Sequence, residues 1–338
     1  MLESSSIDLL QDKKNLLAFS AGVDSTALFF LLLQHNIKFD IAIVNYGQRD
    51  QSEDEVLYAS ELAKKHKLSC YTYNAKTISR NFESKAREIR YDFFNSLIDE
   101  QKYENLLTAH HLGDRFEWML MQFCKGAGCA ELSGMRAFEK RENYQLVRPL
   151  LHLDKSELLT YLNDKNIKYF VDETNFDESI KRNYFRQNIT KPLLEKHLSG
   201  IKKSFDYIDA DRDELIQELS VNSIDDFRYF NSANKRSDIY TIDKELKSLG
   251  HIITAEERKL LQSNDVVVVG RKYLIVQQNS FIFISPYQDK DITILKKDKE
   301  FFRTLKIEPK LRPYLYKNEK AFNIVKNLIS VINLNGER

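Results

Sequence analysis

The sequence predicts an α/β protein in which a doubly wound parallel sheet is followed by a smaller C-terminal domain of helices and strands. Over about the first 200 residues, short apolar runs alternate with helical segments, a pattern that favours parallel strands covered by helices on both faces. A turn of small residues at 20–26 joins the first apolar run directly to a helix. Beyond Leu198 the alternation stops, and short strands separated by turns follow.

The predicted elements of the first part follow one another in order. Strands are expected at 16–19, 39–44, 70–73, 105–109 and 144–148, and helices after Ser25 and at 53–67, 79–102, 116–123 and 154–165. In doubly wound sheets, ligands bind beyond the carboxyl ends of the strands. The loops after Phe19, Val44 and Ala109 are therefore the informative ones.

Length and charge exclude several classes of protein. The 338 residues fit two ordinary domains better than one, and we place the boundary at 197/198. With 51 Lys and Arg against 50 Asp and Glu, no general affinity for polyanions is expected, so a nucleic-acid surface must come from local clustering. Apolar runs fall short of the roughly 18 residues that span a bilayer, and the N-terminal residues do not resemble a signal peptide. We expect a cytoplasmic protein with no membrane partner.

The three cysteines, Cys70, Cys124 and Cys129, form no CxxC pair. Their odd number and spacing indicate neither a disulfide framework nor a zinc site. We expect buried free thiols.

The stretch from Ser20 to Thr26 predicts an anion site. It lies between a strand and a helix, where the first N–H groups of the helix have no internal partner and carry the positive end of its dipole. The hydroxyls of Ser20, Ser25 and Thr26 add donors. The alternative is an ordinary strand-to-helix connection capped by Asp24 or Ser25.

A second group of polar residues follows the strand at 105–109. Asp114 and Glu117 are three residues apart in the first turn of a helix, where they can hold Mg²⁺ or a substrate ammonium. The alternative is that they only complement the helix dipole. His110 and His111 are either phosphate donors or plain loop residues.

A pair of arginines, Arg182 and Arg186, lies four residues apart with aromatic residues between them. On one helix face they suit phosphate or nucleotide contacts, although a solvated basic face has the same pattern.

The C-terminal part, 198–338, is predicted to form helices at 202–219, 240–250 and 255–262 and strands at 266–269, 273–276 and 281–284. A basic cluster interleaved with aromatic residues follows, and this composition suits RNA phosphates and unstacked bases. An ordinary surface over core aromatics is equally compatible. The cluster consists of Lys296, Lys297, Lys299, Arg303, Lys306, Lys310, Arg312 and Lys317 with Phe301, Phe302, Tyr314 and Tyr316.

Several separated stretches together resemble one family, the bacterial tRNA(Ile)-lysidine synthetases of the PP-loop ATP pyrophosphatase superfamily. The resemblance covers about residues 14–197 and keeps the order of the family's motifs. The stretches are 20–26 (SAGVDST), 86–91 (AREIRY), 106–111 (LLTAHH), 126–128 (GAG), 146–151 (LVRPLL), 171–175 (VDETN), and Arg182, Asn183 and Arg186.

The resemblance implies a PP-loop fold and an ATP-dependent ligation. Free L-lysine would be joined through its ε-amine to C2 of the wobble cytidine in an isoleucine tRNA with a CAU anticodon, through an adenylated base. ATP would become AMP and pyrophosphate, with Mg²⁺ as cofactor. Lysine must attack as the neutral amine, but at pH 7 only on the order of one part in a thousand of its ε-amine is neutral. A carboxylate that holds the ammonium and accepts its proton is therefore useful.

The resemblance also implies roles for individual residues. Asp24, Asp114, Glu117 and Arg87 would be catalytic, and Asp24 and Asp114 would bind the metal. Arg87, Arg90, Arg182 and Arg186 would neutralise phosphate charge or guide the tRNA. The residues implied to bind ATP are Ser20, Ala21, Gly22, Val23, Asp24, Ser25, Thr26, Arg182 and Arg186.

The sequence departs from the family pattern in three loops. The family's Gly-Gly is Ala21-Gly22 here, and a Cβ in a left-handed backbone conformation costs roughly 1–2 kcal/mol. The family's Asp-Asp-Gln-x-Glu-Thr is the stretch 113–118, Gly-Asp-Arg-Phe-Glu-Trp, so this loop has one carboxylate fewer and an additional arginine beside the implied metal ligand. A family loop of the His-Gly-Leu-Arg type corresponds only loosely to 45–49.

Two other functions stay open. One is 2-thiolation of tRNA by another PP-loop enzyme, and the other is a non-catalytic nucleotide- or tRNA-binding relative. The oligomeric state is also open, with a homodimer as one possibility.

Overall fold

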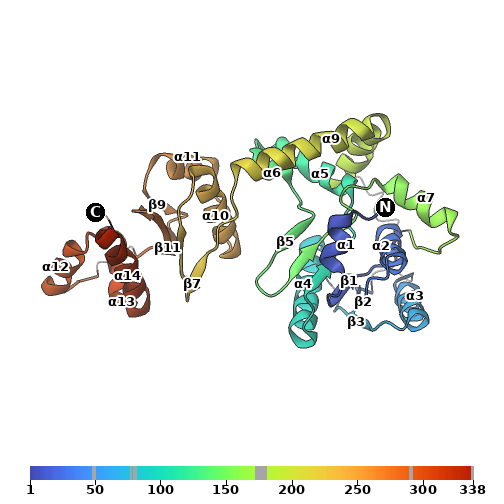
Figure 1. Cartoon of the computed structure of the whole chain (residues 1–338), viewed down its shortest axis with the longest axis horizontal. Coiled ribbons are helices and arrows are strands. Elements are labelled where there is room, and N and C mark those ends of the chain that lie inside the picture. Colours follow the sequence, from blue (N-terminus) through green and yellow to red (C-terminus); the bar gives the residue numbers. More distant parts are fainter. Residues whose placement is uncertain (48–50, 77, 79–81, 172–180, 289–291, 336–338) are drawn as a thin grey trace. The chain divides into compact units, whose positions relative to one another are not determined.

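The computed structural model describes residues 1–47, 51–76, 78, 82–171, 181–288 and 292–335, the last five by their backbone only. The chain divides into two compact units, Met1–Asp209 and Ala210–Arg338 (Figure 1). The predicted boundary at 197/198 falls at a kink in a long helix, where His197 has φ −133° and ψ 24°.

The first unit is built on a sheet with the strand order β3-β2-β1-β4-β6-β5. The first five of these strands are parallel and β5 is antiparallel, which confirms the doubly wound sheet. The strands are β1 (Asn15–Ala18), β2 (Phe39–Asn45), β3 (Cys70–Asn74), β4 (Asn105–Leu107), β5 (Phe138–Lys140) and β6 (Gln145–Val147).

Helices cover both faces of this sheet (Figure 1). Leu17 of β1 belongs to a core with residues of α2, α3 and α7, whereas Leu16 belongs to a core with residues of α4. Successive strand residues therefore face opposite helix layers, as expected for a sheet buried on both sides. The helices are α1 (Ser4–Leu10), α2 (Val23–Gln34), α3 (Gln51–His66), α4 (Phe82–Gln101), α5 (Leu112–Phe123), α6 (Cys129–Ser133), α7 (Lys155–Asp164), α8 (Lys181–Phe185), the π-helix η2 (Arg186–Thr190) and α9 (Lys191–Leu215).

The strand order places the site. The chain passes from β1 outward to β2 and β3 and then returns to β4, on the other side of β1. The order reverses between β1 and β4, and ligands of doubly wound sheets bind at such a switch point. The loops after β1 and β4 consequently begin on adjacent parallel strands.

The second unit is built on an antiparallel sheet with the order β7-β8-β11-β10-β9. The three predicted strands are found as β9 (Val266–Val269), β10 (Tyr273–Gln278) and β11 (Phe281–Pro286), and sequence patterns missed β7 (Asn222–Ile224) and β8 (Phe227–Asn231). Its helices are α10 (Lys235–Ser248), α11 (Ala255–Ser263), α12 (Lys296–Thr304), α13 (Arg312–Lys317) and α14 (Glu319–Asn335).

One expectation about the cysteines is wrong. No disulfide joins these three cysteines, but Cys124 is exposed and Cys70 and Cys129 are only partly buried. Cys124 caps the C-terminus of α5, where the helix leaves the core.

Candidate active site

The loop from Ser20 to Gly22 leads from β1 into α2. Ala21 is fully buried and adopts a left-handed conformation with φ 57°, and its carbonyl accepts a hydrogen bond of 3.0 Å from the N–H of Phe170. Gly22 is the N-cap of α2 in an extended conformation, without a side-chain cap. The loop therefore holds its shape while the first N–H groups of α2 stay available to an anion.

Hydroxyl groups reinforce this loop. Ser25 Oγ accepts a hydrogen bond from the Ser20 backbone N–H at 3.2 Å and lies 3.1 Å from Ser20 Oγ. Thr26 Oγ1 and Asp24 Oδ1 are buried without a hydrogen-bond partner in the described part of the chain. Unpaired buried oxygens are costly, so these two atoms indicate a polar ligand at the loop.

The loop after β4 brings a histidine between two carboxylates. His111 is the N-cap of α5, and its Nδ1 accepts a hydrogen bond of 3.0 Å from Gly113 N–H. The proton of a neutral ring must then be on Nε2, which lies 3.6 Å from Asp114 Oδ2 and 3.9 Å from Asp24 Oδ2. His111 thus connects the loop after β1 with helix α5.

The glycine at 113 follows from this arrangement. A Cβ at Gly113 would lie 2.7 Å from His111 Cε1, closer than such atoms approach. Gly113, which stands where the family has its first aspartate, therefore leaves room for the imidazole of His111.

Asp114 and Glu117 of helix α5 contact Arg182 of α8 and Arg186 of η2. Arg182 donates to Asp114 Oδ1 at 2.8 Å and to Glu117 Oε2 at 3.0 Å. Arg186 donates to Glu117 Oε1 at 2.7 Å and to Asp114 Oδ1 at 3.3 Å. Glu117 is only 1% exposed. The structure thus joins two pairs that the sequence indicated separately.

The charges of this cluster shift the pKa values of its members. Burial alone raises the pKa of Asp114, but His111, His110, Arg182 and Arg186 outweigh it and hold the pKa far below the usual range. Burial lowers the pKa of Arg182, and the two carboxylates more than compensate, so its pKa is raised. Asp114 and Arg182 are therefore both ionised at neutral pH.

His110 behaves differently from its neighbour. Its Nδ1 lies 2.9 Å from Thr108 Oγ1. Burial, together with the charges of Arg148, Arg182 and Arg87, lowers the pKa of His110 to about 4 against the opposing effect of Asp114. His110 is therefore neutral at pH 7.

Arg87 lies outside the carboxylate and arginine cluster. It projects from α4, and its guanidinium stacks on the ring of Tyr91 at 4.6 Å from the ring centre. Tyr91 and Arg90 lie on the same helix, and Arg90 donates to Tyr46 OH at 3.3 Å. The charge of Arg87 nevertheless acts on His110.

One residue of the site was not singled out by the sequence, and another was noted only as a departure from the family pattern. Lys155, the first residue of α7, places its Nζ 3.7 Å from Asp24 Oδ2, and no local pattern indicated this contact across 131 positions. Arg115 is buried beneath the site, where it donates to Ser133 O at 2.9 Å and pairs with Asp209. These contacts compensate the buried charge and explain how an arginine is tolerated where the family has glutamine.

Of the two predicted metal ligands, Asp24 suits a metal ion better than Asp114 does. Among the described residues, no group of three or more His, Cys, Asp or Glu side chains is placed to hold a metal ion. The unpartnered Oδ1 of Asp24 fits a Mg²⁺ that phosphates also coordinate. Both oxygens of Asp114 already accept hydrogen bonds, from the arginines and from His111 N–H, so this arrangement does not favour Asp114 as a ligand.

Parts of the predicted site fall on residues outside the described ones. These are Gln48 and Arg49 of the loop after β2 and the acidic stretch 172–175.

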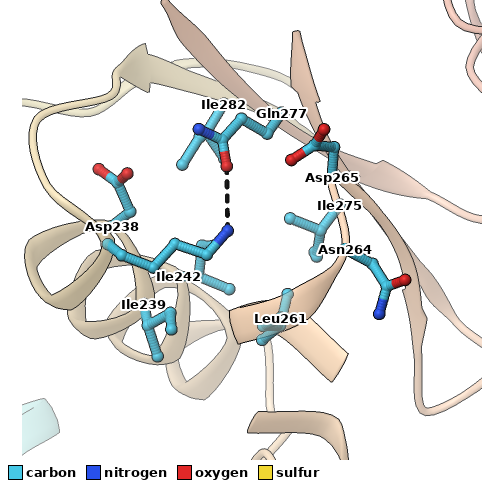
Figure 2. Close-up of a pocket in the computed structure, with 10 residues that line it drawn as sticks. Asp238, Ile239, Ile242, Leu261, Asn264, Asp265, Ile275, Gln277 and Ile282 are labelled. Carbon is cyan, nitrogen blue, oxygen red and sulfur yellow. Dashed lines mark hydrogen bonds between the residues drawn. The ribbon is translucent and has the colours of Figure 1, made fainter. Parts of the chain in front are cut away.

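In the second unit, two of the four aromatic residues of the predicted basic cluster are buried and two are exposed. Phe302 and Tyr314 are buried in its core, whereas Phe301 and Tyr316 are 44% and 36% exposed. A cavity of about 10 Å³ in this unit, where Lys235 Nζ donates to Gln277 Oε1 at 3.2 Å, has room for about one water molecule (Figure 2). It is too small for a nucleotide.

Comparisons with known proteins agree with the geometry. The model of the PP-loop domain family matches residues 2–193. The chain is 43% identical over 309 residues to the tRNA(Ile)-lysidine synthase of Wolinella succinogenes, which covers 91% of this chain and 94% of that protein. It is 40% identical over 311 residues to the tRNA(Ile)-lysidine synthase of Campylobacter jejuni strain RM1221, at 92% and 95% coverage. The chain belongs to the tRNA(Ile)-lysidine synthase family.

Membership in the tRNA(Ile)-lysidine synthase family makes this chain an enzyme of the PP-loop type, for which ATP binding follows. Among solved structures, it resembles the U34-tRNA thiolase NcsA from Methanococcus maripaludis, with a TM-score of 0.52, 18% identity and coverage of 64% and 78% of the two chains. That likeness concerns the fold. In the described part of this lysidine synthase family member, none of the helices has the length and apolarity needed to traverse a bilayer.

Proposed function

We propose that this protein joins free L-lysine, through its ε-amine, to C2 of the wobble cytidine of the CAU-anticodon isoleucine tRNA. ATP is consumed to AMP and pyrophosphate. One observation carries the proposal beyond family membership: His111 Nε2 lies within 4 Å of both Asp24, on the pyrophosphate loop, and Asp114, in the arginine-bound carboxylate pair. This contact supports a phosphate site beside an ammonium site, the arrangement that ligation of an amine at an adenylated base requires.

In the first step, cytosine O2 attacks the α-phosphorus of ATP, and the bond from that phosphorus to the bridging oxygen breaks. The electron pair stays on the bridging oxygen, which leaves with pyrophosphate. The N–H groups at the start of α2 and the hydroxyls of Ser20, Ser25 and Thr26 are suited to bind the phosphates. Val23 and Gly22 would contribute through their backbones.

The loop also fits the metal that the family implies. Asp24 Oδ1 would hold Mg²⁺, which supplies positive charge against the phosphate oxygens when bound.

In the second step, the lysine ε-ammonium gives one proton to solvent, the neutral amine attacks C2 of the cytidine, and AMP leaves with the former O2. Asp114 keeps its negative charge because its pKa is far below the usual range. Such a carboxylate is a weak proton acceptor. Because the oxygens of Asp114 and Glu117 already accept hydrogen bonds, the incoming ammonium would displace one of these contacts, and the pair would orient it rather than remove its proton. Arg182 and Arg186 fix the two carboxylates and supply positive charge for the departing AMP.

The tRNA partner is assigned to basic residues of the second unit. Helix α12 carries Lys296, Lys297 and Lys299, and Phe301 of the same helix is exposed. Such a surface suits backbone phosphates and an unstacked base. Because ATP, free lysine and tRNA are cytoplasmic, we place the protein there. A homodimer remains a prediction.

One assay tests the proposal. The protein is incubated with radiolabelled lysine, ATP, Mg²⁺ and a transcript of the CAU-anticodon isoleucine tRNA, with a transcript carrying uridine at the wobble position as the control. Acid-precipitable label with AMP release, dependent on the wobble cytidine, is expected. ATP-dependent sulfur transfer, or no lysine incorporation, would refute the proposal.

The variant Asp24→Ala tests the role of the pyrophosphate loop. We expect loss of pyrophosphate release with an unchanged circular dichroism spectrum, since Asp24 Oδ1 has no hydrogen-bond partner among the described residues and Oδ2 makes only long contacts of 3.7 and 3.9 Å. Unchanged turnover would remove Asp24 from the mechanism.

A further inference from the structure

Lys155 is held beside the pyrophosphate loop by fixed backbone. Leu112 N–H at the start of α5 donates to Leu153 O at 2.9 Å, which ties the segment before α7 to the site helix. Asp154 caps α7 by accepting from Ser156 N–H at 2.9 Å, and the Asp154 N–H donates to Glu157 Oε2 at 2.7 Å. The backbone of Lys155 is therefore anchored, while its side chain is 45% exposed.

The ammonium of Lys155 and the carboxylate of Asp24 are only loosely paired. Their separation of 3.7 Å is longer than a charge-assisted hydrogen bond of about 2.7–2.9 Å. Among the described residues, no closer partner of the Lys155 ammonium is found, although the ammonium carries three donors. Asp24 likewise has a buried oxygen without a partner. The Lys155 ammonium therefore has donors left for an anionic ligand, and the Asp24 oxygen has room for a cation.

The ligand that fits this position is an anion at the start of α2. Asp24 lies in the first turn of that helix, where N–H groups and the helix dipole favour phosphate. Asp24 belongs to this first turn, and its Oδ2 lies 3.7 Å from the Lys155 ammonium. The Lys155 ammonium beside this turn can offset the negative charge of a bound phosphate while the backbone of the loop keeps its conformation.

We propose that Lys155 binds the non-bridging oxygens of the pyrophosphate that leaves ATP. This inference rests on the proposed function, because it assigns the residue to the leaving group of its first step. As the bond between the α-phosphorus and the bridging oxygen breaks, the electron pair adds negative charge to pyrophosphate. The Lys155 ammonium then moves from its loose contact with Asp24 to these oxygens and stabilises the departing charge.

Calorimetric titration with inorganic pyrophosphate tests this assignment without tRNA or lysine. Lys155→Met should weaken pyrophosphate binding by about tenfold or more, the usual effect of one hydrogen bond to a charged group. Lys155→Arg should recover most of the affinity. Lys165→Met is the matched control, because Lys165 ends the same helix and stacks on Tyr161. The proposal would be overturned if the pyrophosphate affinity of the Lys155→Met variant lay within twofold of that of the Lys165→Met variant.

A second comparison separates direct binding from an effect through Asp24. If Lys155 contacts pyrophosphate, Lys155→Met should still weaken its binding in an Asp24→Asn background, and loss of the effect there would overturn the proposal. A raised KM for free lysine with unchanged pyrophosphate affinity would also overturn it, since Lys155 would then serve the amino acid. Failure of the wild-type protein to incorporate lysine would refute the proposed function, while the pyrophosphate titration still decides the role of Lys155.

Discussion

At the scale of single residues, Ala21 shows how the pyrophosphate loop tolerates a departure from its family. Its φ of 57° is a conformation that costs a residue with a Cβ roughly 1–2 kcal/mol. The methyl group is fully buried, and burial of one such group contributes about 0.8 kcal/mol. Alanine also restricts the unfolded chain more than glycine does, by about 0.4–1 kcal/mol. These contributions nearly cancel.

Ala21→Gly is therefore expected to change the free energy of unfolding by less than about 1 kcal/mol. Urea denaturation measures this change. Lys67 is the matched control, because it has the same φ of 57° but an exposed side chain at the end of α3. Lys67→Gly loses no buried methyl group and should stabilise the protein by several tenths of a kcal/mol more than Ala21→Gly. A loss above about 2 kcal/mol for Ala21→Gly would contradict this account.

His110 gives the fold a dependence on pH. Burial and nearby arginines lower its pKa to about 4, against roughly 6.5 in the unfolded chain. Between these values the unfolded state binds more protons, so this contribution to stability is complete above pH 6.5 and is lost as the pH falls towards 4. His110→Asn keeps a polar partner for Thr108 and should flatten the slope of unfolding free energy against pH over that range. An unchanged slope would show that another group is responsible.

At the scale of elements, the site depends on the pairing of α5 with α8 and η2. The carboxylates on α5 and the guanidiniums of Arg182 and Arg186 are 65 to 72 residues apart in sequence. Arg186 begins a π-helical turn, a local geometry that often occurs at functional sites. This turn follows α8 directly, so that Arg182 at the start of α8 and Arg186 at the start of η2 both pair with Glu117.

Glu117→Gln tests the energetic weight of this pairing. Breaking a buried ion pair costs about 3–5 kcal/mol, and here about 2–4 kcal/mol is expected because Asp114 still pairs with both arginines. The exposed pair of Glu104 with Lys13, at 2.8 Å, provides the control. Glu104→Gln should cost less than about 1 kcal/mol in the same denaturation experiment. Equal effects of the two substitutions would mean that the cluster is effectively solvated.

At the scale of the whole molecule, the chemistry and the proposed RNA surface belong to different units. The first unit carries the pyrophosphate loop and the ion-pair cluster, and the second carries α12 with its lysines. Because the net charge is only +1, attraction for tRNA must come from such local groups.

Replacing Lys296 and Lys297 by Gln should weaken tRNA binding and make it less sensitive to salt. Each lost phosphate contact lowers the slope of log affinity against log salt by roughly 0.7–0.9, so a change of about 1.5 is expected. Filter binding at several salt concentrations measures the slope. Lys64→Gln with Lys65→Gln, at the end of α3, removes the same charge from the first unit as a control. Equal slopes in the two double variants would remove α12 from the RNA surface.

The sequence alone determined the parallel sheet, the loop at 20–26 and the placement of Asp114 and Glu117 in one helical turn. These features are local, since periodicity, small residues and i, i+3 spacing act over a few positions. Sequence patterns missed β7, β8 and helices α12 to α14, whose short or mixed segments depend on packing against the second core.

Only the tertiary structure decided what the charged residues do. It paired Asp114 and Glu117 with Arg182 and Arg186, placed His111 between two carboxylates, and brought Lys155 to Asp24. Such contacts join distant positions, and their effect on charge depends on burial, which lowers the local dielectric constant and strengthens each interaction. The sequence thus determined which groups are present in the site, and the fold decided which of them act together.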